Sequence, residues 1–188
     1  MTDAPISDED LARQVQGGNL QAFTELVRRY QDKLLRYGGR FLRGSNDLED
    51  IVQEVMLKAY RNIQGYHSQQ RFSPWIYRIA HNAFIDVLKR QRLEPVPFFD
   101  PDELWPHPMA ADNPSHDADQ SIVRQQLDIC LNELEAKYRE PLILRYYDDL
   151  SYKEIARILR LPTGTVSIRL KRGLTQLAER YRHHQYHQ

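Results

Sequence analysis

The sequence has little of what secreted, membrane or cofactor-binding proteins contain. Cys130 is the single cysteine, so neither an intramolecular disulfide nor a Cys-x-x-Cys metal site can form. No apolar run approaches the roughly 20 residues that span a bilayer, and the start MTDAPISDED is acidic where a signal peptide is basic and then apolar. Only 8 of the 188 residues are glycine, and they form no Gly-rich phosphate loop. We therefore expect a cytoplasmic protein without membrane insertion, cofactor or metal, with Cys130 as a buried core residue.

Net charge is absent as well, because 26 basic residues balance 26 acidic ones. A neutral chain argues against a nucleic-acid partner, since phosphate contacts need positive charge. The charge is segregated, however. Residues 151–182 carry eight basic side chains against two acidic ones, whereas residues 93–121 carry seven acidic side chains and no Lys or Arg. The sequence therefore contains a basic C-terminal module preceded by an acidic spacer.

The spacer is also where proline is concentrated. The stretch EPVPFFDPDELWPHPMAADNPSHDAD holds six of the 10 prolines, which remove backbone donors and resist helix continuation. We predict that residues 93–120 form a flexible acidic linker between two small domains, 1–92 and 121–188. Phe98, Phe99 and Trp105 are too apolar for an inert tether, so we expect part of the linker to pack on another surface.

Helical spacing of apolar residues dominates both predicted domains, and no strand-like alternation occurs. Gly17-Gly18 ends a first short helix, and Asn19 is placed to cap a longer one. Ser73 followed by Pro74 predicts the cap and first turn of a later helix. We therefore expect an all-α protein whose first domain is a helical bundle.

A helix-turn-helix pattern lies in the basic module. Ser151 and Glu154 fit a capping box, and Leu161-Pro162 breaks the chain before the basic helix TVSIRLKRG. A short capped helix, a tight turn and a basic second helix are what the major groove of DNA accepts. Val166, Leu170, Leu174 and Leu177 are predicted to face the first helix. The candidate DNA-binding residues are Thr163, Gly164, Thr165, Ser167, Arg169, Lys171 and Arg172, with Thr163 also capping the helix; the alternative is an ordinary solvated basic helix.

Aromatic residues alternate with arginines in YHSQQRFSPWIYRIAHNAFIDVLKRQR. Aromatic rings can stack on bases that have left the duplex while arginines hold phosphates. Trp75 also shares a helical face with Ile76, Ile79 and Phe84, so a core role for it is an equal alternative. The candidate residues for single-stranded DNA are Tyr66, Arg71, Phe72, Trp75, Tyr77, Arg78, Asn82, Lys89 and Arg90.

Taken in order, DLEDIVQEVMLKAY, FSPWIYRIAHNAFIDVLKRQR, the acidic spacer and LSYKEIARILRLPTGTVSIRLKRG resemble the extracytoplasmic-function (ECF) sigma factors of bacterial RNA polymerase, group 4 of the sigma-70 family. The resemblance implies a non-enzymatic subunit that directs core polymerase to specific promoters. It implies that residues 1–92 form region 2, which binds the β′ clamp helices and melts the minus-10 element. Residues 121–188 would form region 4, which reads the minus-35 element and contacts the β flap.

Further expectations come from the same resemblance. Asp47, Asp50, Gln53 and Glu54 are implied to bind core polymerase, although a solvated acidic face is the plain alternative. The loop 65–72 is implied to hold a flipped minus-10 base, with Asn82 and nearby basic residues contacting the single strand. Many family members carry a basic and a small polar residue where this chain has Ser167 and Ile168. An anti-sigma partner and a stress or envelope response are also implied.

Two other classes of protein compete with this interpretation. A helix-turn-helix repressor or response regulator explains the C-terminal half, but it needs a ligand or phosphoacceptor domain that the N-terminal half does not resemble. An enzyme would depend on His81, Asp86 or the acidic linker, and these form no catalytic constellation in the sequence. The histidines of the tail YRHHQYHQ could bind a metal, but we expect a frayed polar terminus.

Overall fold

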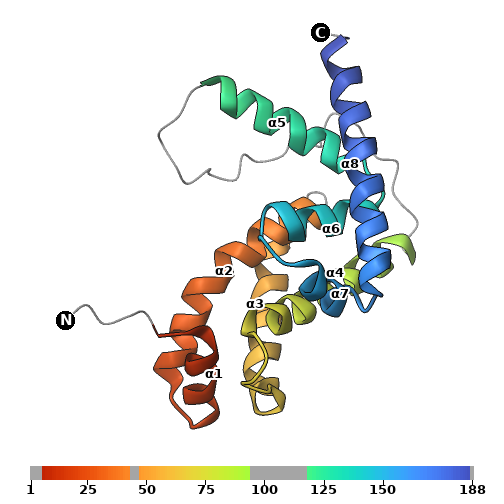
Figure 1. Ribbon diagram of the computed structural model, residues 1–188. Helices are drawn as coiled ribbons and strands as arrows, with labels where there is room; N and C mark the ends of the chain where they lie inside the picture. The colour runs from red at the N-terminus through yellow and green to blue at the C-terminus, as the bar shows by residue number, and fades with distance from the viewer. Residues whose placement is uncertain (1–5, 43–46, 94–117, 187–188) are drawn as a thin grey trace, which may run out of the picture.

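The computed structural model describes residues 6–42, 47–93 and 118–186, which form helices joined by short turns (Figure 1). In chain order these are α1 (Asp8–Gln16), α2 (Leu20–Leu42), α3 (Leu48–Asn62), the 3-10 turn η1 (Ile63–Gly65), α4 (Phe72–Leu93), α5 (Ala118–Asn132), α6 (Ala136–Tyr146), α7 (Tyr152–Leu159) and α8 (Thr163–Tyr186). No strand and no helix long and apolar enough to cross a membrane occurs in these ranges. The all-α prediction is confirmed, whereas most of the predicted linker lies outside the described residues.

Local capping signals place several helix ends correctly. Asn19 Oδ1 accepts hydrogen bonds from the N–H groups of Gln21 and Ala22, at 3.0 and 3.3 Å, and so caps α2. The predicted capping box at α7 is present, with the Ser151 and Glu154 side chains each bonded to the other's backbone N–H. Such bonds satisfy donors that the first helical turn leaves free.

Two local predictions of helix starts are wrong. Helix α4 begins at Phe72, so Ser73 lies inside the helix, and the Phe72 N–H donates instead to Glu9 Oε1 at 2.9 Å. Helix α8 already includes Thr163, which therefore occupies a helical position rather than the preceding cap position.

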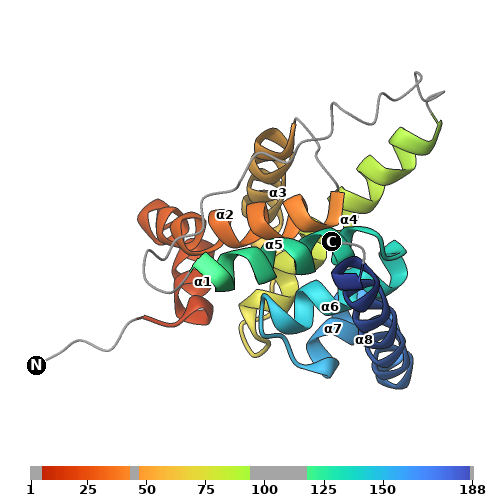
Figure 2. The ribbon, with the colours of Figure 1, turned by 90° about the horizontal axis from the view of Figure 1, so that it is seen from above.

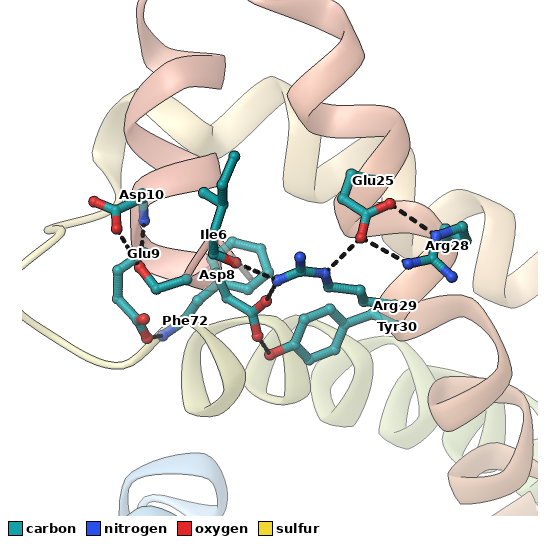
Figure 3. A network of polar contacts seen from close by, with 10 residues as sticks. Ile6, Asp8, Glu9, Asp10, Glu25, Arg28, Arg29, Tyr30 and Phe72 are labelled. Atoms are coloured by element: carbon teal, nitrogen blue, oxygen red, sulfur yellow. Dashed lines mark hydrogen bonds and ion pairs between the residues drawn. The ribbon is translucent and has the colours of Figure 1, made fainter. Parts of the chain in front are cut away.

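Helix α1 is fastened to α2 and to the start of α4 by a polar network (Figure 3). Arg29 Nη1 donates to Asp8 Oδ1 at 2.7 Å, and the Tyr30 hydroxyl donates to Asp8 Oδ2 at 2.6 Å. The Glu9 side chain points to the other side of α1 and accepts a hydrogen bond from the Phe72 N–H at the start of α4 (Figure 3). The network is partly buried, where charge-assisted hydrogen bonds are strong. It fixes α1 across the end of the loop that precedes α4.

The core of the first four helices is aromatic and centred on α2 and α4. Tyr37 and Phe84 are almost fully buried, with ring centroids 5.1 Å apart, and Phe41 lies 5.9 Å from Tyr37. These residues belong to the apolar stripes expected from helical spacing. Cys130 is buried in the second half, as predicted.

Gly38 allows α2 to approach this core closely. A Cβ atom added at Gly38 would lie 2.5 Å from Leu48 Cδ1 and 2.9 Å from Phe84 Cζ. We expect Gly38→Val to lower the free energy of unfolding by about 2 kcal/mol, because an overpacked core must displace its neighbours. Urea unfolding measures the change. Gly164→Ala is the matched control, since no atom lies within 4 Å of a Cβ there, and an unchanged stability for Gly38→Val would contradict this packing.

The two helical halves, α1–α4 and α5–α8, pack against each other, with α6 in contact with α2 and α7 in contact with α4; Figures 1 and 2 show the second half beside the first. Apolar residues of both halves share one core, and buried polar contacts also join the halves. Glu140, which is 5% exposed, accepts a hydrogen bond from the Tyr37 hydroxyl, and its Oε1 lies 2.6 Å from His81 Nδ1. Arg139 Nη2 donates to the Phe41 carbonyl oxygen at 2.7 Å. The sequence predicted two domains but not this contact between them.

Candidate nucleic-acid and polymerase interfaces

Helices α7 and α8 form the predicted helix-turn-helix. Arg160 ends α7 in a left-handed conformation, with φ of 54°, and the Leu161 N–H donates to the Ala156 carbonyl oxygen at 3.0 Å. Val166 and Leu170 are buried and hold α8 against the rest of its half. The turn therefore presents the first turns of α8 to solvent as a rigid unit.

The candidate residues on α8 are mostly accessible. Arg169 and Thr165 are half-buried, and the other five are exposed: Thr163, Gly164, Ser167, Lys171 and Arg172. The prediction that Leu174 faces inward is wrong, because its side chain is 41% exposed. Gly173 is buried instead, and a Cβ atom added to it would lie 3.0 Å from Leu142 Cδ1. The absence of a side chain lets α8 approach α6.

The aromatic segment before and within α4 divides into buried and exposed members. Tyr66, Phe72 and Tyr77 are each at most 3% exposed, and Trp75 is half-buried against the rings of Tyr66 and Phe72. The remaining candidates are exposed: Arg71, Arg78, Asn82, Lys89 and Arg90. In this arrangement the polar and basic residues are accessible to DNA, and three of the four rings serve the core.

The loop between η1 and α4 is held at both ends by α1. Gln16 Nε2 donates to the carbonyl oxygens of Ile63 and Tyr66, both at 2.8 Å. The Tyr66 hydroxyl donates to the Gln70 carbonyl oxygen within the loop. His67, Gln69 and Gln70 remain exposed between these anchors, so the loop offers polar side chains on a fixed frame.

Two candidate DNA-binding residues are bonded by the second half of the molecule. Arg71 Nη1 lies 2.5 Å from Glu154 Oε1, and the Tyr77 hydroxyl donates to Asp148 Oδ1 at 2.6 Å. Burial opposes ionisation of Glu154, but its hydrogen bonds to Ser151 and the charge of Arg71 outweigh that and lower its pKa. Helix α7 and the turn before it therefore contact two of the side chains that are candidates for binding the minus-10 element.

Asp148 makes this contact sensitive to pH. Burial raises its pKa from 3.8 to about 6, against the hydrogen bond from Tyr77, which lowers it. The folded protein therefore binds a proton more tightly than the unfolded chain, so stability falls as pH rises from about 4 to about 6. We expect this group to change the free energy of unfolding by about 2 kcal/mol across that window. Urea unfolding at pH 4, 5, 6 and 7 should show the slope in the wild type and a smaller one in Asp148→Asn; equal slopes would contradict the assignment.

The four acidic and amide residues predicted to bind polymerase lie at the start of α3 and are all exposed: Asp47, Asp50, Gln53 and Glu54. Glu54 Oε1 lies 2.9 Å from Lys58 Nζ, and this hydrogen bond lowers the Glu54 pKa. The acidic residues near the helix N-terminus also interact favourably with its dipole. These residues are therefore exposed to solvent in the free chain. A polymerase-binding surface and an ordinary solvated acidic face both require this exposure.

An apolar groove beside this acidic face was not predicted. It lies between α2 and α3 and is lined by Phe23, Val27, Gln31, Val52, Gln53, Met56 and Leu57. Leu57 is 53% exposed, and Tyr60, one turn further along, is 40% exposed. An apolar Leu57 beside the acidic residues, off the inner stripe of the helix, was the sequence signal for this groove.

The residues considered for catalysis or metal binding have structural partners. His81 contacts Glu140, and Asp86 lies 3.9 Å from Lys89 Nζ on the surface. His184 Nε2 lies 2.9 Å from Glu133 Oε1. Within the described ranges, no group of three or more His, Cys, Asp or Glu residues is placed to hold a metal ion.

Comparison with known proteins finds matches for both halves of the chain. The family model "Sigma-70 region 2" matches residues 26–94, and "Sigma-70, region 4" matches residues 124–177. The chain is 33% identical over 178 residues to the ECF RNA polymerase sigma factor SigW of Bacillus subtilis, covering 90% of this chain and 94% of SigW. It is 34% identical over 175 residues to the ECF RNA polymerase sigma-E factor of Escherichia coli K12, covering 89% and 91%.

Solved structures have the same fold. CnrH in complex with the cytosolic domain of CnrY superposes with a TM-score of 0.69 at 23% identity, covering 92% of this chain and 95% of CnrH. RpoE of Bartonella quintana, in complex with the anti-sigma factor NepR, gives a TM-score of 0.66 at 24% identity, covering 85% and 96%. With both family models in order and relatives of this identity along nearly the whole chain, the protein belongs to the ECF sigma factors of the sigma-70 family.

Proposed function

We propose that this sigma factor binds core RNA polymerase in the cytoplasm and directs it to promoters as a non-enzymatic subunit. The observation that carries the proposal is the combination, in one chain, of a helix-turn-helix with an exposed basic face and an acidic helix beside an apolar groove. The first suits duplex DNA and the second suits a protein partner. A repressor needs only the first.

For DNA, the proposed division follows the two halves of the chain. Residues 1–92 would hold the minus-10 strand through Arg71, Arg78, Asn82 and the basic end of α4, with Trp75 able to stack once it is uncovered. Residues 121–188 would place the start of α8 in the minus-35 major groove. Residues 93–120 would connect them. Each contact alone is small, so a polymerase that fixes their separation converts two weak contacts into one avid one.

For core polymerase, the proposed surface is the start of α3 together with the groove between α2 and α3. The exposed carboxylates Asp50 and Glu54 would supply charge complementarity, and the apolar groove would supply buried area. The β′ clamp helices are the proposed partner there, and the β flap is the proposed partner of the second half.

Control by an anti-sigma protein is the third part of the proposal. CnrH and RpoE, which share this fold, were solved with CnrY and with the anti-sigma factor NepR. A protein covering the groove and the acidic face would exclude polymerase from this chain. Release of that protein in a stress or envelope response would then start transcription.

Transcription with purified components tests the proposal. The full chain is mixed with core polymerase and a promoter library, and the RNA products are sequenced. We expect promoter-specific transcripts that require both proteins, and weak promoter binding by the free chain. A chain that ignores core polymerase but binds duplex DNA tightly on its own would establish the repressor alternative instead.

A further inference from the structure

Helix α8 exposes an apolar side chain, Ile168, near its N-terminal end. Ile168 is 55% exposed, and the residues beside it on that face, Ser167, Lys171 and Arg172, are polar or basic and exposed. The opposite face carries Val166 and Leu170, both at most 1% exposed. Ile168 is therefore directed away from the hydrophobic core.

Isoleucine at this position contributes little to the stability of the fold. A β-branched residue is a weaker helix former than Lys or Arg, and a half-exposed apolar side chain keeps most of its surface in water. Gly164, one turn earlier on the same face, has no atom within 4 Å of where a Cβ would lie. Ile168 thus projects from a stretch of the helix surface that a DNA groove can approach closely.

We propose that Ile168 contacts the C5-methyl group of a thymine in the minus-35 element and so contributes to promoter specificity. Thymine is the one base that presents a methyl group in the major groove, and apolar side chains recognise it by contact. Lys171 and Arg172 flank Ile168 on the helix surface and can hold the phosphates that set its register. The inference rests on the proposed placement of α8 in the minus-35 major groove.

The test uses holoenzyme formed from the full chain and core polymerase. Duplexes randomised across the minus-35 region are selected for binding, and each thymine of the selected element is then replaced by uracil, which removes only the methyl group. Affinity is measured by mobility shift on fluorescent duplexes. We expect one thymine at which uracil weakens binding about fourfold, the effect of one methyl group removed from an apolar contact.

Ile168→Ala identifies the side chain responsible. This variant should bind the thymine promoter about fourfold more weakly than the wild type does and should no longer distinguish thymine from uracil at that position. Ile168→Val, which keeps a branched apolar side chain, should retain part of the preference. Leu174→Ala, at an exposed apolar position further along α8, is the control and should leave the preference unchanged.

Three results would overturn the inference: a selected element without thymine, an equal affinity for all uracil-substituted duplexes, or an Ile168→Ala variant that still prefers thymine at the same position. Failure of the proposed function gives a different result. If randomising the whole minus-35 region leaves holoenzyme affinity unchanged, α8 does not read that element, and the inference fails with it.

Discussion

Glu140→Ala is expected to lower the free energy of unfolding by about 3 kcal/mol, because it removes the acceptor at the centre of a buried polar contact. The carboxylate joins Tyr37 of α2 and His81 of α4 to α6. Burial raises the pKa of Tyr37, and the nearby Glu140 charge raises it further, so this hydroxyl remains a donor at neutral pH. Without Glu140, a fully buried donor has no acceptor.

Urea unfolding with far-ultraviolet circular dichroism measures this change. Glu179→Ala, at an exposed position of α8, is the matched control and should change stability by less than about 0.5 kcal/mol. Glu140→Gln keeps an oxygen acceptor and should lose only about 1 kcal/mol. A Glu140→Ala variant as stable as the Glu179→Ala variant would show that the two halves do not depend on this contact.

The double reversal Asp50→Lys with Glu54→Lys is expected to weaken binding to core polymerase by at least about a hundredfold. Both side chains are exposed at the start of α3, and the pair between Glu54 and Lys58 is on the surface, where such pairs contribute little to stability. The variant should therefore fold normally, and only its affinity for core polymerase should fall.

Fluorescence titration of labelled sigma factor with core polymerase measures that affinity. Asp32→Lys with Glu179→Lys makes the same change in net charge at two other exposed positions, so it separates local complementarity from long-range electrostatics. Equal weakening in both double variants would remove α3 from the proposed interface, and no weakening in either would do so as well.

The spacing of apolar residues was sufficient to predict the helices and much of the core. Leu26, Tyr30, Leu34, Tyr37 and Phe41 are all buried, and each lies three or four positions from the next, which is the spacing of one helix face. The capping box at Ser151 is equally local. Signals of this kind involve only residues near each other in sequence, so they can be recognised without knowledge of the tertiary structure.

Contacts between distant segments could not be predicted in this way. Glu140 and Arg139 precede the apolar run of α6, and their partners Tyr37 and Phe41 lie about a hundred residues earlier in the sequence. Ser73 has the sequence of a cap, but Glu9 provides that bond from α1. Leu174 has the right spacing for the core, but Gly173 allows the closer packing. The distant partners Tyr37, Phe41 and Glu9 have no fixed spacing from these residues in the sequence.

The bonds from Arg71 to Glu154 and from Tyr77 to Asp148 have a thermodynamic consequence. In the proposed function, minus-10 DNA and Glu154 compete for Arg71, so closure of the chain and binding of the minus-10 strand would be linked equilibria with opposite signs. The apparent affinity of the free chain is reduced by the fraction of molecules that are open. Any partner that holds the halves apart raises affinity for promoter DNA without touching the DNA, and by reciprocity single-stranded promoter DNA strengthens the binding of that partner.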